Sequence, residues 1–423
     1  MGILIKNGYL IDPSTKREGV FDILIEKDKV SRIAKRIDTK RVEVIDAKGM
    51  QVFPGLIDIH CHLREPGGED KETIYTGSLS AVSGGFTTIC CMPNTSPSLD
   101  NKVAIRFVID RARESLCDVL PIGAITKGRE GKELAPYGEM VEEGAVAFSD
   151  DGDCVMDSLV MRRALEYTKL YRKPIISHSE DKNLSRNGVM NEGVISTKMG
   201  LRGIPAEAET IMINRDISLA KMTGGYLHLA HLSVSDSVEM VREAKRHMDN
   251  LTSEVAIHHL FLTEEDVKGY NTNMKVNPPL RTTKDISALI KGLKDGTIDC
   301  IVTDHAPHTE EEKGTGFENA PFGMIGFETA LSLSMELQDK GVSLMKIISL
   351  FTTGPARILG VDKGCLSESK YADIVIFDPE EEWIYRKEDI KSKSKNSPFI
   401  GRKMKGRVIK TIYKGRVVFS RER

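Results

Sequence analysis

The sequence has no long hydrophobic run and no excess of charge of either sign. None of its apolar stretches approaches the roughly 20 residues that a membrane-spanning helix needs, and the N-terminal MGILIKNGYLIDP lacks the pattern of a signal peptide. The 60 Lys and Arg residues nearly balance the 62 Asp and Glu residues, which excludes bulk electrostatic binding to nucleic acid as the main task. We therefore expect neither nucleic acid nor a membrane among the partners.

Cysteine is scarce as well. The seven cysteines are odd in number and scattered, mostly within apolar runs, which argues against a disulfide framework and predicts reduced thiols in a cytoplasm. What is present is a composition of 40% hydrophobic and 29% charged residues, which permits sizeable cores and excludes a disordered chain. A length of 423 residues suggests two or three domains, or one large barrel with an accessory module.

The two ends of the chain carry similar short, β-like runs separated by turn signals. The strand candidates are residues 3–5, 23–26, 42–46, 370–378 and 408–419. The last run contains Lys-Gly as a hairpin turn. We predict that these runs close one small β-sandwich domain from both termini, formed by residues 1–53 and 354–423.

Between the two ends, eight apolar, strand-like runs alternate with helical stretches. The runs are VFPGLIDIHCHL, FTTICCMP, DVLPIGAIT, AVAFSDD, PIISHSED, YLHLAHLS, LTSEVAIHH and DCIVTDHAP. Helical candidates include residues 158–171, 206–222, 236–248 and 285–294. Such alternation favours a parallel sheet, and eight repeats predict a (β/α)₈ TIM barrel over residues 54–353. The Gly-rich, polar segment 309–326 indicates a mobile loop over a site.

Metal-binding residue types cluster where these runs end, which is the face of such a barrel that carries active sites. His60 and His62 are two apart, so on a strand they point to the same side and could bind one zinc-like ion. The alternative is a pair of exposed or hydrogen-bonded histidines. Asp150 and Asp151 face opposite ways on an extended chain, so only one can point into the mouth, where a carboxylate can bridge two ions.

The remaining candidates follow the later runs. His178 ends the fifth run, and the sixth offers His228 and His231, of which His231 is the better ligand and His228 is interpreted as a core histidine. Asp304, at the end of the eighth run, could bind a metal and accept a proton as a general base. A set of His and Asp without Cys fits a two-ion, zinc-type catalytic site better than a structural zinc.

Several motifs in register carry a resemblance to a known family. They are DIHCHLREPG (58–67), CCMPNTSP (90–97), VAFSDDG (146–152), the paired His of SEVAIHHLFL (253–262), VNPPLR (276–281), DHAPH (304–308) and NAPFG (319–323). Together they resemble the long-chain bacterial and archaeal dihydroorotases of the amidohydrolase superfamily. The resemblance covers nearly the whole chain. It implies reversible, zinc-dependent cyclisation of N-carbamoyl-L-aspartate to (S)-dihydroorotate, the third step of pyrimidine biosynthesis.

The resemblance also implies residue roles. One or two Zn²⁺ ions would be bound by His60, His62, Asp151, His178, His231 and Asp304. Asp151 would bridge the ions, where many amidohydrolases use a carboxylated lysine, and AVAFSDD contains no lysine. Asp304 would be the catalytic base. Substrate contacts would come from His62, Leu63, Arg64, Asn94, Asn277, His308, Phe322 and Gly323. Arg64, with Asn94 and His308, would hold the free carboxylate, which a planar guanidinium suits.

Other readings stay open at this point. A hydantoinase or allantoinase would share the metal pattern, and a non-catalytic dihydroorotase-like scaffold would be expected to lose ligands. Residues 385–423 contain 14 Lys and Arg against 3 Asp and Glu, a net charge of +11. A solvated sheet edge protected by basic side chains explains this charge. The alternatives are a docking face for aspartate transcarbamoylase, by family analogy, or a homodimer.

Overall fold

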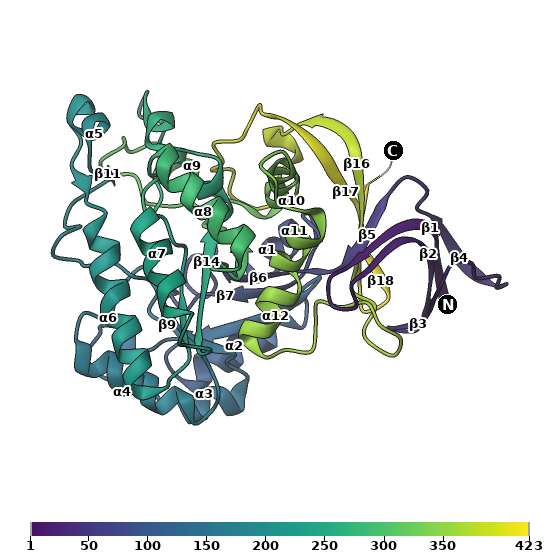
Figure 1. The fold of residues 1–423 in the computed structure, drawn as a ribbon, viewed down its shortest axis with the longest axis horizontal. Helices are drawn as coiled ribbons and strands as arrows, with labels where there is room; N and C mark the ends of the chain where they lie inside the picture. Colours follow the sequence, from purple (N-terminus) through teal and green to yellow (C-terminus); the bar gives the residue numbers. More distant parts are fainter. Residues whose placement is uncertain (1, 422–423) are drawn as a thin grey trace.

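The computed structural model describes residues 2–421, and its centre is a barrel of eight parallel strands (Figure 1). In barrel order the strands are β6 (Leu56–Cys61), β7 (Phe86–Cys91), β8 (Asp118–Gly123), β9 (Ala147–Ser149), β10 (Ile175–Ser177), β13 (Leu227–Leu229), β14 (Leu251–Ala256) and β15 (Cys300–Val302). Each strand lies within one of the eight predicted runs. The barrel closes between its first and last strands, where Asp304 donates its N–H to the carbonyl of His60 at 3.0 Å and His62 donates to His305 at 2.8 Å.

Helices cover the outside of the barrel and follow its strands (Figure 1). They are α1 (Ile74–Ser83), α2 (Lys102–Ala112), α3 (Tyr137–Glu143), α4 (Ser158–Lys169), α6 (Glu207–Thr223), α7 (Ser235–Ala244), α8 (Thr283–Asp295), α10 (Phe327–Met335), α11 (Leu344–Phe351) and α12 (Thr353–Leu359). The four predicted helices are confirmed with small shifts of their ends. The start of α4 is fixed by Asp157, whose carboxylate accepts from the N–H groups of Leu159 and Val160.

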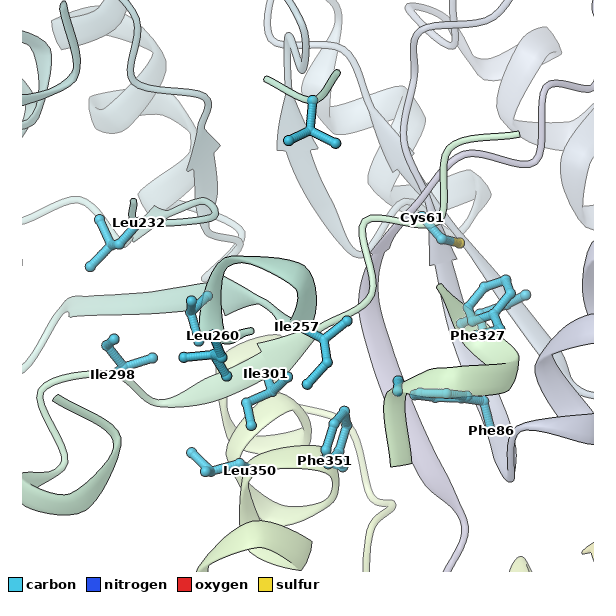
Figure 2. Close-up of a cluster of buried hydrophobic side chains, with 14 of the residues drawn as sticks. Cys61, Phe86, Leu232, Ile257, Leu260, Ile298, Ile301, Phe327, Leu350 and Phe351 are labelled. Carbon is cyan, nitrogen blue, oxygen red and sulfur yellow. The ribbon is translucent and has the colours of Figure 1, made fainter. Parts of the chain in front are cut away.

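The main core lies between the barrel strands and these helices. Figure 2 shows part of it, where apolar side chains of β15, α10 and α11 meet those of β6 and β7. Phe86 packs its ring against Phe327 and Phe351, with centroids 5.5 and 6.0 Å apart. Such packing holds the strand ends at fixed spacing, so that side chains beyond them point to one place.

The two ends of the chain together form a second, mixed sheet of eight strands, which confirms that both termini build this part of the fold (Figure 1). Its strands are β1 (Gly2–Asp12), β2 (Arg17–Glu26), β3 (Lys29–Ala34), β4 (Val42–Asp46), β5 (Gln51–Pro54), β16 (Ile374–Ile384), β17 (Lys403–Tyr413) and β18 (Arg416–Ser420). The N-terminal β5 pairs antiparallel with the C-terminal β16, which joins the two ends. A separate cluster of buried apolar side chains packs on this sheet. The division of the chain at residues 53 and 354 stays a prediction.

The predicted loop 309–326 is folded rather than open. It contains the short helix α9 (Glu310–Lys313), and the buried ammonium groups of Lys275 and Lys313 donate to carbonyls within it or beside it. The two-residue strands β11 (Met190–Asn191) and β12 (Gly203–Ile204) and the helix α5 (Val194–Met199) extend the loop after β10.

Over residues 2–421, every helix is too short or too polar to cross a membrane.

Candidate active site

The six predicted metal ligands meet at the C-terminal mouth of the barrel. They are His60, within β6, and His62, Asp151, His178, His231 and Asp304, each one or two residues past the end of its strand. All six are buried, with no more than 7% of any residue exposed. His231 and Asp304 have positive φ angles of 31° and 48°, which are uncommon for residues other than glycine and mark strain held by the surrounding fold.

Asp151 occupies the centre of this group. Its Oδ1 lies 3.2 Å from Nε2 of His60, 3.5 Å from Nδ1 of His178 and 3.8 Å from Nε2 of His231. Its other oxygen, Oδ2, lies 3.6 Å from Nε2 of His62. One carboxylate therefore faces four imidazoles with two oxygens, as a bridging ligand between two ions would. The neighbouring Asp150 faces away, and its carboxylate accepts from Ile125 and Thr126.

The nitrogen and oxygen atoms of these side chains are arranged better for binding a cation than for hydrogen bonding to one another. Nε2 of His60 and Oδ1 of Asp151 are close, yet neither completes a hydrogen bond with any residue that the structure describes. Two overlapping sets of ligand atoms lie close enough to surround an ion: His60, His62 and Asp151 form one, and Asp151, His178 and His231 form the other. Buried polar atoms without partners are rare in folded proteins, so this arrangement supports a metal site.

Asp304 completes the first set. Its Oδ1 lies 3.1 Å from Nε2 of His62 and 3.7 Å from Nε2 of His60. Burial alone would raise the pKa of Asp304, but the hydrogen bond to His62 and the nearby His60 ring hold it below its ordinary value. The same balance, dominated among the neighbours by His60, holds the pKa of Asp151 well below its ordinary value. Both groups are carboxylates that can bind a cation or accept a proton.

The sequence did not reveal Glu254, which lies beneath His60 in β14. Its Oε1 is 2.6 Å from Nδ1 of His60, and its Oε2 is 3.0 Å from Nε2 of His228. Burial would raise the pKa of Glu254, but the neighbouring His60 and His228 rings lower it to about 2. The signal that the sequence offered for Glu254 was an acidic residue within an apolar, strand-like run. The structure confirms His228 as a core histidine, because its ring is fully buried between Glu254 and Thr252.

A second missed carboxylate, Glu180, orients His178. Its Oε2 lies 3.0 Å from Nε2 of His178 and accepts from Lys182 at 2.7 Å and from Asn277 at 2.8 Å. The predicted substrate residue Asn277 therefore stands beside the second ligand set. A cleft of about 540 Å³ opens here, lined in part by Glu180, Lys182, Asn277 and Phe322. Of the residues that line it, Glu180 and Asn277 contact His178.

Arg64 and His308 form a basic pair at the other side of the mouth. The Arg64 guanidinium lies 3.2 Å from Nε2 of His308, and its Nε donates to the Pro307 carbonyl at 3.1 Å. Burial and the adjacent Arg64 charge lower the pKa of His308 to about 3, so the imidazole is neutral at pH 7. A charged guanidinium with unused donors beside a neutral imidazole suits a carboxylate ligand.

The other predicted substrate residues fall in different settings. Asn94 contacts the ligands, with Oδ1 2.9 Å from Nδ1 of His62 and Nδ2 3.4 Å from Asp151. The Leu63 side chain is buried in the main core, so only its backbone can face the mouth. The Phe322 carbonyl lies 2.9 Å from Nε2 of His308, and the Gly323 N–H donates to the Lys275 carbonyl at 2.8 Å.

Comparison with known proteins gives consistent matches. The family model described as Dihydro-orotase-like matches residues 49–237. A dihydroorotase of Endomicrobium trichonymphae is 52% identical over 423 residues, covering 99% of this chain and 100% of that protein. A dihydroorotase of Caldicellulosiruptor saccharolyticus is 49% identical over 421 residues, covering 98% of each chain.

Solved structures match the architecture. An L-hydantoinase (dihydropyrimidinase) from Arthrobacter aurescens has a TM-score of 0.89 at 25% identity, covering 100% of this chain and 96% of that one. A dihydropyrimidinase from Brevibacillus agri has a TM-score of 0.86 at 24% identity, covering 99% and 95%. The second likeness shows a shared fold alone. Both come from enzymes whose names differ from those of the sequence relatives, so the choice of substrate depends on the site.

Proposed function

Because this chain belongs to the dihydroorotase family, we propose that its barrel mouth catalyses the reversible cyclisation of N-carbamoyl-L-aspartate to dihydroorotate, a step of pyrimidine biosynthesis. The observation that carries the proposal is Asp151, buried among four imidazoles with Asp304 beside them. The Arg64–His308 pair supports a substrate with a free carboxylate. A hydantoinase-type activity is the second candidate, favoured by the likeness of the fold to hydantoinases.

The residues present fit a metal centre with one or two ions, and we propose Zn²⁺. His60, His62 and Asp304 would hold one ion, His178 and His231 the other, and Asp151 would contact both. Bound metal would acidify a water molecule and polarise the amide carbonyl. Metal analysis of the purified protein tests the identity and number of the ions, and fewer than one divalent ion per chain would contradict this assignment.

The side chains have separate tasks in the hydrolytic direction. Asp304 is a carboxylate that takes a proton from the attacking water and returns it to the leaving ring nitrogen. Arg64 binds the substrate carboxylate with its planar donors, and His308 flanks it. Asn277 and Phe322 line the cleft and hold the ring amides there, together with the carbonyl of Gly323, whose N–H already donates to Lys275. Burial of the mouth keeps other water away from the reacting carbonyl.

Replacing Asp304 by asparagine tests the proposed base. Asp304→Asn keeps the shape but cannot accept the proton, so we expect the rate of dihydroorotate hydrolysis to fall at least about 100-fold with the fold retained. The matched control is Asp299→Asn, a buried acid at the opposite end of the barrel that accepts from Ser253 and Arg357. Activity retained in Asp304→Asn would refute the role. Assays with dihydroorotate, hydantoin and allantoin side by side separate the two candidate functions.

The equilibrium of the reaction should depend on pH. Hydrolysis creates a second carboxylate, which releases a proton above its pKa of about 4. Cyclisation consumes that proton, so lower pH favours dihydroorotate and higher pH favours the open form. Approaching equilibrium from both sides at pH 6, 7 and 8 measures this, and we expect the ratio to change about tenfold per pH unit. A ratio that does not change would contradict the reaction.

Two further proposals concern the surroundings of the protein. The free thiols of all seven cysteines support a cytoplasmic location. The basic segment 385–423 supports docking of aspartate transcarbamoylase through charge, although Lys393, Lys395 and Lys414 donate to partners within the chain. Sizing the two enzymes together at low and high salt tests this, and separate elution under both conditions would count against it.

A further inference from the structure

The connection between β16 and β17, residues 385–402, leaves the terminal sheet and lies on the barrel side of it (Figure 1). Two carboxylates of the barrel accept hydrogen bonds from its backbone N–H groups. Glu328 accepts from the N–H groups of Lys391 at 2.7 Å and Ser392 at 3.1 Å. Glu72, which is fully buried, accepts from the Lys393 N–H at 3.2 Å. The connection is therefore anchored in the barrel and is not a free surface loop.

Asn396 is a buried polar residue of this connection and is 4% exposed. Its Oδ1 accepts from the His308 N–H at 3.0 Å. Its Nδ2 donates to the carbonyls of Ala306 at 3.0 Å and Gly323 at 3.2 Å. Its own backbone carbonyl accepts from the Ile325 N–H at 3.0 Å. One amide thus supplies an acceptor and two donors to two separate chain segments of the barrel.

The two segments carry different parts of the proposed substrate site. The first, residues 304–308, ends at His308, which pairs with Arg64. The second, residues 322–325, begins with the backbone proposed to hold the ring amides. They approach closely at Gly323, where φ is +130° and an added Cβ would stand 2.6 Å from Cβ of Ala306. Only a planar amide of this length offers one acceptor and two donors in this geometry.

We propose that Asn396 is a positioning residue for substrate binding. It fixes the distance between the carboxylate-binding pair Arg64–His308 and the amide-binding backbone at Phe322 and Gly323. The substrate spans both, so a change of spacing weakens its binding more than it slows the chemistry at the metal ligands. The inference rests on the proposed function and extends it, because it makes the C-terminal connection a part of the substrate site.

Steady-state hydrolysis of dihydroorotate by the metal-loaded, full-length chain tests the proposal. Asn396→Ala removes all three side-chain hydrogen bonds, and we expect KM to rise roughly tenfold with kcat changed less than about threefold. Asn396→Asp places a carboxylate against two carbonyl oxygens, and KM should rise at least as much. The matched control is Ser394→Ala, which removes one bond from the same connection to the Lys71 carbonyl and should leave KM within about twofold.

An unchanged KM in Asn396→Ala would overturn the proposal. An equal rise in Ser394→Ala would overturn it too, because the connection would then act only through its general stability. Hydrogen exchange at the His308 amide, whose N–H donates to the Asn396 side chain, gives a readout without turnover. Exchange should accelerate in Asn396→Ala and not in Ser394→Ala.

The two readouts separate the possible failures. A wild-type chain that does not hydrolyse dihydroorotate would contradict the proposed function. It would also contradict the substrate role of Asn396, even if hydrogen exchange responds as expected. An active wild type with unchanged exchange in Asn396→Ala defeats the Asn396 proposal alone.

Discussion

At the scale of single residues, Glu254 supports His60, one of the proposed metal ligands. Its carboxylate holds Nδ1 of His60, so that Nε2 faces Asp151. A carboxylate behind a histidine ligand fixes the ring and raises its basicity. In Glu254→Gln we expect the affinity for the divalent metal to fall about 10- to 100-fold. Competition with a chromophoric chelator measures this without any turnover.

The control for this variant is Glu328→Gln. Glu328 is a partly buried carboxylate that accepts from Ser80 and from backbone N–H groups, and no ligand histidine is among its partners in residues 2–421. Its replacement should leave the chelator competition unchanged. Equal metal affinity in Glu254→Gln and the wild type would show that packing alone orients His60.

The ligand candidates were predictable because His60 stands near the end of an apolar strand and the other five just beyond one, and strand ends of a parallel barrel meet. Glu254 and Glu180 were not, because a sequence does not show which nitrogen of a histidine needs a partner. Asn396 is separated from His308 by 88 positions, and no local period links them. Its role follows only from the path of the connection between β16 and β17.

At the scale of elements, two buried lysines hold the segment 309–326, and the mobility predicted for it stays a prediction. Lys275 donates its ammonium to the carbonyls of Phe317 at 2.8 Å and Glu318 at 2.9 Å. Lys313 donates to Pro321 at 2.8 Å and to Thr272 at 3.1 Å. Gly and polar residues predict a loop, but the two lysines that fasten it look like ordinary surface residues in the sequence.

Burial, with the nearby charge of Lys275 adding to it, lowers the pKa of Lys313 to about 7 in the folded protein. The unfolded chain keeps a lysine pKa of about 10.4, so between these values the unfolded state holds a proton that the folded state has lost. The stability due to this group therefore rises with pH. We expect the wild type to gain stability relative to Lys313→Met as pH increases from 7 to 10, measured by urea unfolding.

The exposed Lys132 provides the comparison, because within residues 2–421 its ammonium contacts only the side chain of Glu130. The difference between the wild type and Lys132→Met should stay constant over the same pH range. A constant difference for Lys313→Met as well would mean that its ammonium keeps an ordinary pKa in the fold.

At the scale of the whole molecule, the alternation of runs predicted the barrel, and its eight strands are confirmed. The hydrophobic period of each run and the order of strands and helices determine such an architecture, since a parallel strand must be followed by a crossover. The terminal strands were predicted to pair across the chain, but β3 was missed because its alternation, KVSRIA, is weak. The contacts between the terminal sheet and the barrel depend on single side chains, so the hydrophobic pattern of the sequence could not predict them.

Asp118 is one such contact, and it joins the start of β8 to the terminal sheet. Its carboxylate lies 2.5 Å from Nζ of Lys363 and accepts from Lys414 at 2.9 Å and from Tyr413 at 2.6 Å. Burial would raise the pKa of Asp118, but Lys363 and the hydrogen bonds hold it below its ordinary value. A lowered pKa in the fold means stability that is present above the ordinary pKa and is lost as pH falls through the folded value.

Asp118→Asn should therefore reduce the free energy of unfolding by about 1.5–3 kcal/mol at pH 7, since hydrogen bonds to a charged group are lost. The difference from the wild type should be flat between pH 8 and 5 and shrink below pH 4. The control, Asp362→Asn, removes an exposed pair with Lys370 and should cost less than about 1 kcal/mol. Urea unfolding followed by two probes, one in each sheet, measures this. If Asp118 couples the sheets, both probes report one transition in the wild type. If Asp118→Asn shows the same single transition with no loss of stability, another contact couples the sheets.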